Sequence, residues 1–128
     1  MELTIEQALQ QGIAAHKAGK LQDAEKLYRA ILQSQPNHPD ANHNLGVLAV
    51  SVNKANAALP FFKTALEANP KIEQFWLSYI DALIRTEKVD DARQVLADAQ
   101  RAEVTAAKLQ IFEEQLNLYN LDDLERLI

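Results

Sequence analysis

The sequence predicts an all-α fold built from repeated helix pairs, and three observations support this prediction. First, Gly12 and Gly46 are separated by 34 residues, and so are Pro36 and Pro70. Second, Ala, Leu, Gln, Glu and Lys favour helices and are abundant, whereas only three Gly and four Pro interrupt the 128-residue chain. Third, hydrophobic residues make up 48% and charged residues 24%, which is ordinary globular usage and is enough apolar material to bury a core.

The same interval extends across most of the chain. The other recurring positions are Lys20, Lys54 and Lys88; Ala24, Ala58 and Ala92; Tyr28, Phe62 and Leu96; and Ile31, Ala65 and Ala99. A period of 34 with Leu-Gly in a first helix, Ala-x3-aromatic in a second and a closing Pro resembles the tetratricopeptide repeat (TPR) family. The third copy is degenerate, because Ile80 stands at the glycine position and Val104 at the proline position.

The resemblance implies an α-solenoid of three TPR helix-turn-helix units followed by a capping helix. The expected units are residues 5–38, 39–72 and a degenerate 73–106, and residues 107–128 would hold the capping helix and a short C-terminal helix. Within them we expect helices over about 5–18, 21–34, 39–52, 55–68, 72–85 and 89–102. Thr4 and Gln7 have the spacing of a capping box. Gly12 and Gly46 would lie mid-helix, where only a close helix crossing explains a glycine.

After the third unit, apolar residues at helical spacing predict an amphipathic capping helix over about 105–119. Lys108, Glu113 and Glu114 would form its polar outer face. Asn120 would then cap a separate short helix over about 121–128. Because that helix ends abruptly on Leu127 and Ile128, we expect the natural chain to continue.

Charge and composition argue against several classes of function. The net charge is −5, and residues 65–128 carry thirteen acidic against seven basic side chains, so the surface would repel a phosphate backbone and a nucleic-acid partner is not expected. There is no cysteine, and therefore no disulfide or thiolate site. Neither a leader nor an apolar run long enough to cross a membrane is visible. We expect a cytoplasmic protein without a membrane partner.

The sequence shows no pattern typical of catalysis, a metal or a cofactor. With three glycines, neither a phosphate loop nor a dinucleotide fingerprint is possible. His38 and His43 are five residues apart, which does not place two imidazoles on one helix face. Ser51, Asp81 and His43 could share a surface, but no oxyanion hole accompanies them. The prediction is a protein that is not an enzyme.

In TPR proteins the first helices of successive units line a concave groove that holds extended peptides. By this resemblance the peptide-binding groove would comprise Leu9, Ile13, His16, Lys17, Asp40, His43, Asn44, Val47, Val50, Leu77, Ser78, Asp81 and Arg85. Some family members clamp a C-terminal carboxylate there. At the clamp positions only Asn44 survives, because the others hold Leu9, Ile13, Gln74 and Ser78, which cannot fix a carboxylate by charge-assisted hydrogen bonds.

The function expected from these residues is a protein–protein interaction scaffold that binds a peptide segment or a neighbouring domain. Two alternatives remain open at this point. Residues 76–83 and Asp90-Asp91-Ala92 look like N-terminal TPR segments of bacterial glycosyltransferase, sulfotransferase or methyltransferase proteins, which would make the chain a substrate-recruitment or oligomerisation module. The chain could also form a homo-oligomer, either through the apolar stretch Leu116 to Ile128 or by stacking of the first unit on the last.

Overall fold

The computed structural model describes residues 2–127, with side chains through residue 119. The described part contains seven α-helices and no strand, which confirms the all-α prediction. Their bounds are α1 (Ile5–Lys17), α2 (Leu21–Ser34), α3 (Pro39–Ser51), α4 (Ala55–Ala68), α5 (Glu73–Arg85), α6 (Val89–Arg101) and α7 (Ala106–Leu127). The first six lie within one residue of the bounds predicted from the sequence. The chain divides into an N-terminal unit, Met1–Pro70, and a C-terminal unit, Lys71–Ile128.

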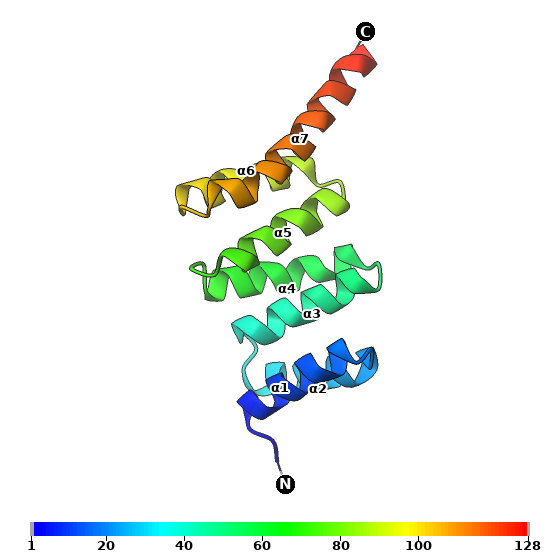
Figure 1. The fold of residues 1–128 in the computed structure, drawn as a ribbon, viewed down its shortest axis with the longest axis vertical. Helices are drawn as coiled ribbons and strands as arrows, with labels where there is room; N and C mark the ends of the chain where they lie inside the picture. Colours follow the sequence, from blue (N-terminus) through cyan, green and yellow to red (C-terminus); the bar gives the residue numbers. More distant parts are fainter. Residues whose placement is uncertain (1, 128) are drawn as a thin grey trace. The chain divides into compact units, whose positions relative to one another are not determined.

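Within the N-terminal unit each helix packs against the next one in the sequence, and α1 also contacts α3 (Figure 1). The predicted capping box begins α1: Gln7 N–H donates to Thr4 Oγ1 at 3.1 Å, and Thr4 N–H donates to Gln7 Oε1 at 2.9 Å. The start of α3 is capped differently, because Nδ1 of His38 accepts a hydrogen bond from Ala41 N–H at 3.1 Å. Asn42 is buried and donates to the carbonyl oxygens of Pro36 and His38 at 3.0 and 2.9 Å, which ties the connecting loop to α3.

The tight turn inside each helix pair has the same backbone conformation. Gly19, Asn53 and Glu87 all have positive φ, at 78°, 62° and 59°, and they stand one repeat period apart. The next residue after each one donates a backbone hydrogen bond of 2.8 to 2.9 Å to a carbonyl five residues back. This is the Schellman pattern that satisfies the last carbonyls of a helix. The turn therefore repeats even where the sequence has no glycine.

Gly12 and Gly46 are required by packing, as the sequence predicts. A Cβ atom added to Gly12 would lie 2.5 Å from Cε1 of Tyr28, and one added to Gly46 would overlap the ring of Phe62. Tyr28 and Phe62 are both almost fully buried. Tyr28 also belongs to a cluster with Leu45 and other residues, so it fills space both within its own pair and against α3.

The C-terminal end differs from the prediction of two helices. A single helix, α7, runs from Ala106 to Leu127, and Asn120 lies inside it instead of capping a new helix. The physical reason is that no Gly or Pro occurs after Val104, so nothing in this stretch stops helix propagation. The N-terminal part of α7 was predicted to cap the array with its apolar side, and its residues Leu109, Phe112 and Leu116 are buried.

Of the outer-face residues predicted for this helix, Lys108 and Glu114 are exposed and Glu113 is half-buried. Lys108 lies 3.6 Å from a carboxylate oxygen of Glu73 in α5, and Glu113 accepts a hydrogen bond of 2.9 Å from Gln100 in α6. Both side chains therefore reach toward the other helices of the C-terminal unit. The described part of α7 also exposes two large apolar side chains, Ile111 and Leu118, which are 57% and 61% exposed.

The apolar stretch proposed for self-association is only partly described. Leu116 is 3% exposed and packs inside its own unit, so it is not available to a second copy. The side chains of residues 120–128 lie outside the described residues.

Candidate functional site

In the N-terminal unit the predicted groove residues come from α1 and α3, which contact each other. Most of them are half-buried, so they are held by their neighbours and still reach solvent. This group is Leu9, Ile13, His16, His43, Asn44, Val47 and Val50. Lys17 and Asp40 are exposed at the ends of their helices. Ile13 and Val47 are one repeat period apart and provide an apolar centre.

In the C-terminal unit the predicted groove residues lie on α5. Leu77, Ser78 and Asp81 are half-buried, whereas Arg85 is exposed. Arg85 Nε donates to Asp81 Oδ2 at 2.6 Å, one turn away on the same helix. Both partners are well solvated, so this ion pair adds little stability.

Sequence reasoning missed two residues of the C-terminal unit that continue the same pattern. Ile111 and Leu118 of α7 stand one repeat period after Leu77 and Ile84 of α5. The helices α5 and α7 contact each other. Both members of each helix's pair are seven residues apart and so lie on one face. The repeat period itself could have found them, had it been carried past the third unit.

Asn44 is the centre of a polar cluster that the sequence did not predict. Its side chain hydrogen-bonds with the side chains of both Tyr28 in α2 and His43 in α3. The imidazole of His43 also packs against the ring of Phe62 in α4, with 5.5 Å between centroids and 40° between planes. Through Tyr28, Asn44, His43 and Phe62 the cluster joins α2, α3 and α4 of the N-terminal unit.

Burial dominates the acid–base behaviour of this cluster. It lowers the pKa of His43, although the hydrogen bond with Asn44 and the charge of Asp40 act in the opposite direction. It raises the pKa of Tyr28, and the hydrogen bond with Asn44 opposes the change. A lowered pKa keeps the imidazole neutral near pH 7, so His43 presents a ring and hydrogen-bonding nitrogens instead of a positive charge.

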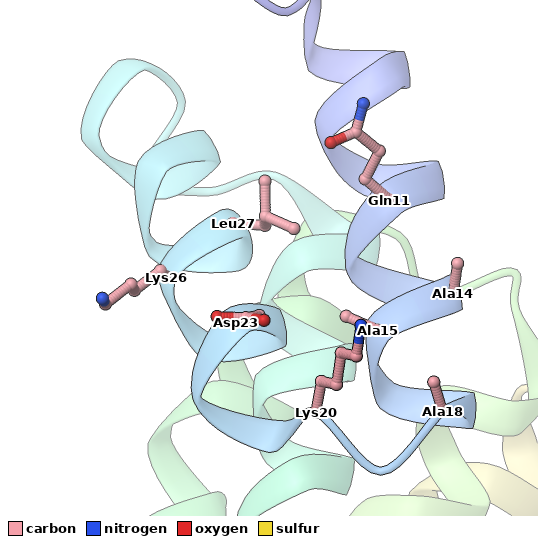
Figure 2. Close-up of a pocket in the computed structure, with 8 residues that line it drawn as sticks. All are labelled: Gln11, Ala14, Ala15, Ala18, Lys20, Asp23, Lys26 and Leu27. Carbon is pink, nitrogen blue, oxygen red and sulfur yellow. The ribbon is translucent and has the colours of Figure 1, made fainter.

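Several cavities lie away from these residues, and two of them are in the N-terminal unit between packed helices. One is a groove of about 650 Å³ between α1 and α2, whose alanine-rich lining is drawn in Figure 2. The other, about 530 Å³, is lined by α2, α3 and α4 and includes Leu48, Val52 and Phe61. Arg29 and Phe61 both line this cavity, and the guanidinium of Arg29 lies 5.9 Å from the centre of the Phe61 ring.

The described residues contain no group of three or more His, Asp or Glu side chains arranged to hold a metal ion. No helix in the described part of the chain is both long and apolar enough to cross a membrane.

Family models match most of the sequence. A model described as tetratricopeptide repeat matches residues 49–116, more than half of the chain, and a second with the same description matches residues 9–71. The chain belongs to the tetratricopeptide repeat family. No curated protein sequence matches this TPR chain.

Solved TPR structures share the fold at low identity. A MamA mutant aligns over 86% of this chain with a TM-score of 0.72 and 24% identity, and the chain spans 64% of its length. SycD from Yersinia enterocolitica, in complex with a peptide of the translocator YopD, aligns over 96% of this chain and 97% of its own, at 0.78 and 16%. The first TPR of Spaghetti (RPAP3), bound to an HSP90 peptide, aligns over 94% and 98%, at 0.79 and 15%.

The surviving clamp residue of this TPR chain is already engaged. Asn44, at the one clamp position that matches, hydrogen-bonds with Tyr28 and His43. Leu9 and Ser78, at two of the other clamp positions, are half-buried and carry no positive charge.

Proposed function

We propose that this TPR chain is an interaction scaffold that binds an apolar segment of another polypeptide. In each unit the binding surface would be the helix faces that carry the predicted groove residues, together with Ile111 and Leu118 of α7. We call these the first-helix faces. The observation that carries the proposal is the set of partly exposed apolar side chains at repeat-equivalent positions. In the N-terminal unit these include Ile13 and Val47, and in the C-terminal unit they include Leu77 and the strongly exposed Ile111 and Leu118. Exposed large apolar side chains gathered on one face of a unit are typical of a binding surface.

The spacing on the C-terminal unit suggests what fits there. Leu77 and Ile84 are one pair of apolar side chains seven residues apart, and Ile111 and Leu118 are a second pair with the same spacing. Seven residues of helix span about 10 Å. A partner with two apolar side chains about 10 Å apart on one face, seven residues apart in a helix or three residues apart in a polyproline II segment, would meet both pairs.

Polar groups next to these apolar pairs would select the partner. The Asp81–Arg85 ion pair supplies one donor and one acceptor on the same face of α5. On the N-terminal unit, neutral His43 supplies hydrogen bonds without charge. We therefore propose a partner segment that is apolar with few charges.

Two of the structurally similar TPR proteins were solved with bound peptides, which supports a polypeptide partner. The role of a recruitment module in a transferase has no support from the family match or from the structures named above. We carry it no further.

A crosslinking experiment tests the proposal. A photoreactive residue at Val47 should capture a protein from cell extract, and the same residue at exposed Glu67 on α4 is the control position. The captured protein, once purified, is titrated against the unmodified chain and against Val47→Glu combined with Leu77→Glu. Since burial of each apolar side chain is worth about 1.5–3 kcal/mol, the double change should weaken binding by more than about tenfold.

The matched control for the titration is Glu67→Gln combined with Arg101→Gln, which changes two exposed charges outside the first-helix faces. It should bind as the unmodified chain does. Equal capture at Val47 and at Glu67, or full binding by a folded Val47→Glu, Leu77→Glu variant, would show that the first-helix faces are not the binding surface.

A further inference from the structure

The cavity lined by α2, α3 and α4 in the N-terminal unit combines an apolar floor with basic side chains. Its volume of about 530 Å³ falls within the range of about 300–1,000 Å³ that is typical of sites for small molecules. Its lining includes none of the residues predicted for the peptide-binding groove. It is therefore a surface that the proposed peptide binding does not use.

Helix α3 forms the floor of this cavity, and α2 and α4 form its walls. Both α2 and α4 pack against α3, but their backbones do not contact each other in the described part of the chain. Leu45 and Leu48 of α3 lie at the bottom, with only 3% and 6% of their surface exposed. Val52, just after α3, is 42% exposed and extends the apolar lining to the surface.

A contact between the two walls closes one part of the cavity. The guanidinium of Arg29 in α2 lies 5.9 Å from the centre of the Phe61 ring in α4, a distance at which a cation is attracted to the face of a ring. Nε of Arg29 also donates to a carboxylate oxygen of Glu25 at 2.8 Å. Arg29 is thus held on both sides, and its charge is partly balanced by Glu25.

The lining carries a net positive charge although the chain as a whole carries −5. Its charged residues are Arg29 and Lys54, which are basic, and Glu25, which is already paired with Arg29. Lys54 forms no ion pair with any residue that the structure describes. An anionic group beside Lys54 would therefore meet a positive charge and no unpaired carboxylate in the lining.

The repeat register shows that the missing carboxylate is specific to this cavity. A lysine precedes the second helix of every unit, and in the first and third units an aspartate follows three residues later. In the second unit an alanine takes that place: the three pairs are Lys20 and Asp23, Lys54 and Ala57, and Lys88 and Asp91. Ala57 lines the cavity, so the residue that would repel an anion is absent where the cavity lies.

We propose that this cavity binds a small amphiphilic carboxylate, with its apolar chain over Leu45 and Leu48 and its carboxylate at Lys54. Charge complementarity selects an anion, and the apolar floor selects a hydrocarbon body. Along α2 the lining runs from Leu21 to Arg29, which is about 12 Å of helix and close to the extended length of decanoate. The eleven lining residues are fewer than the roughly 20–30 that each side of a stable protein–protein interface contributes.

The first test is a titration of the isotopically labelled full chain with decanoate, below the concentration at which it forms micelles, followed by amide chemical shifts in NMR spectra. Saturable changes are expected at Val52, Lys54, Ala57 and Phe61. Octanoate and hexanoate should bind progressively more weakly, by about fourfold for each buried methylene group that is lost. Decanamide has the same chain without the charge and should bind about fivefold more weakly than decanoate.

The second test restores the aspartate that the other two units have. Ala57→Asp places a carboxylate in the lining and gives Lys54 a partner, so it should weaken decanoate binding by at least about tenfold. An acidic residue in the first turn of a helix is favourable, so the variant should stay folded, which circular dichroism checks. Ala107→Asp makes the same change at an exposed position in the first turn of α7 and should bind decanoate as the unmodified chain does.

Four results would overturn the proposal. One is the absence of saturable shifts, and another is a set of shifts confined to the first-helix faces, which would place the apolar chain there. A third is equal binding of decanamide and decanoate, or of decanoate by the unmodified chain and by folded Ala57→Asp, because the charge would then play no part. The last is a decanoate that does not bind while a photoreactive residue at Val52 captures a protein, which would make the cavity a docking groove for a polypeptide.

Discussion

The ring of Phe62 occupies the space that a side chain at Gly46 would need. The first helix pair repeats this relationship, with Tyr28 against Gly12. In the degenerate third pair Ile80 stands at the glycine position. The equivalent of the aromatic ring there is the smaller Leu96. A glycine in the first helix of a pair thus accompanies a large ring in the second, and a larger residue in the first helix accompanies a smaller one in the second. The total side-chain volume between the two helices is therefore similar in each pair.

Gly46→Ala should therefore destabilise the N-terminal unit although alanine favours a helix. The added methyl group gains about 1 kcal/mol of helix propensity. It also overlaps the Phe62 ring, and overpacking costs roughly 1–3 kcal/mol or more when the neighbour cannot move. We expect a net loss of stability in urea unfolding followed by circular dichroism.

A second variant separates packing from other effects of Gly46→Ala. Combining it with Phe62→Leu recreates the smaller partner found in the third pair, so the double variant should lose less stability than the sum of the two single variants. Strict additivity would mean that the ring and the glycine do not interact, and the packing explanation would be abandoned.

The role of the glycines was predictable because a mid-helix glycine that recurs with the repeat needs a packing reason. The interactions of Asn44 were not predictable, because its contact with Tyr28 depends on how α3 packs against α2. The length of α7 was mispredicted because a capping residue such as Asn120 favours a helix start but does not end the helix before it. Repeats fix local packing, whereas side-chain partners across helices depend on the rotamers of the folded unit.

Glu87 offers a test of the repeated turn. It adopts φ 59° at the position where the first pair has Gly19, and a residue with a Cβ atom in this conformation is disfavoured by about 1 kcal/mol. Glu87→Gly should stabilise the C-terminal unit by up to about 1 kcal/mol, and Gly19→Ala should destabilise the N-terminal unit by a similar amount. The fluorescence of Trp76, the single tryptophan, follows unfolding of the C-terminal unit.

The reciprocal pair of variants supplies its own control. If the main effect of glycine were to raise the conformational entropy of the unfolded chain, Glu87→Gly would lower the free energy of unfolding. A measured decrease in stability for Glu87→Gly would therefore contradict the importance of the left-handed turn at this position.

Glu73 joins the beginning of α5 to the beginning of α7. Its Oε1 accepts hydrogen bonds from Thr105 N–H at 2.7 Å and Thr105 Oγ1 at 2.6 Å, and Lys108 Nζ lies 3.6 Å from Oε2. The bonds with Thr105 are the main cause of a lowered pKa at Glu73, and Lys108 contributes. Because the folded pKa is below the unfolded one, this stabilisation is present above the unfolded pKa and is lost as pH falls through the folded pKa.

Glu73→Gln should therefore speed hydrogen exchange at the first amides of α7 at pH 7, with a smaller difference from the unmodified chain in acid. The exposed Glu67→Gln change in α4 is the control and should leave those amides unaffected. Equal exchange rates in the Glu73→Gln variant and the unmodified chain at pH 7 would show that the carboxylate does not hold the start of α7.

His43 makes the stability of the N-terminal unit depend on pH. Burial against Phe62 lowers its folded pKa below the ordinary value of 6.5, against the opposing effects of the Asn44 hydrogen bond and the Asp40 charge. The unfolded chain then binds the proton more readily, so stability is complete above pH 6.5 and falls as pH decreases from there to the folded pKa.

Urea unfolding at several pH values should show this loss in the unmodified chain. His43→Gln, which keeps hydrogen-bonding groups but cannot take up the proton, should have a flatter profile between pH 5 and pH 7 (roughly the range in which histidine titrates). If both proteins lose the same stability over that interval, the acid sensitivity arises from carboxylates elsewhere in the unit and not from protonation of His43.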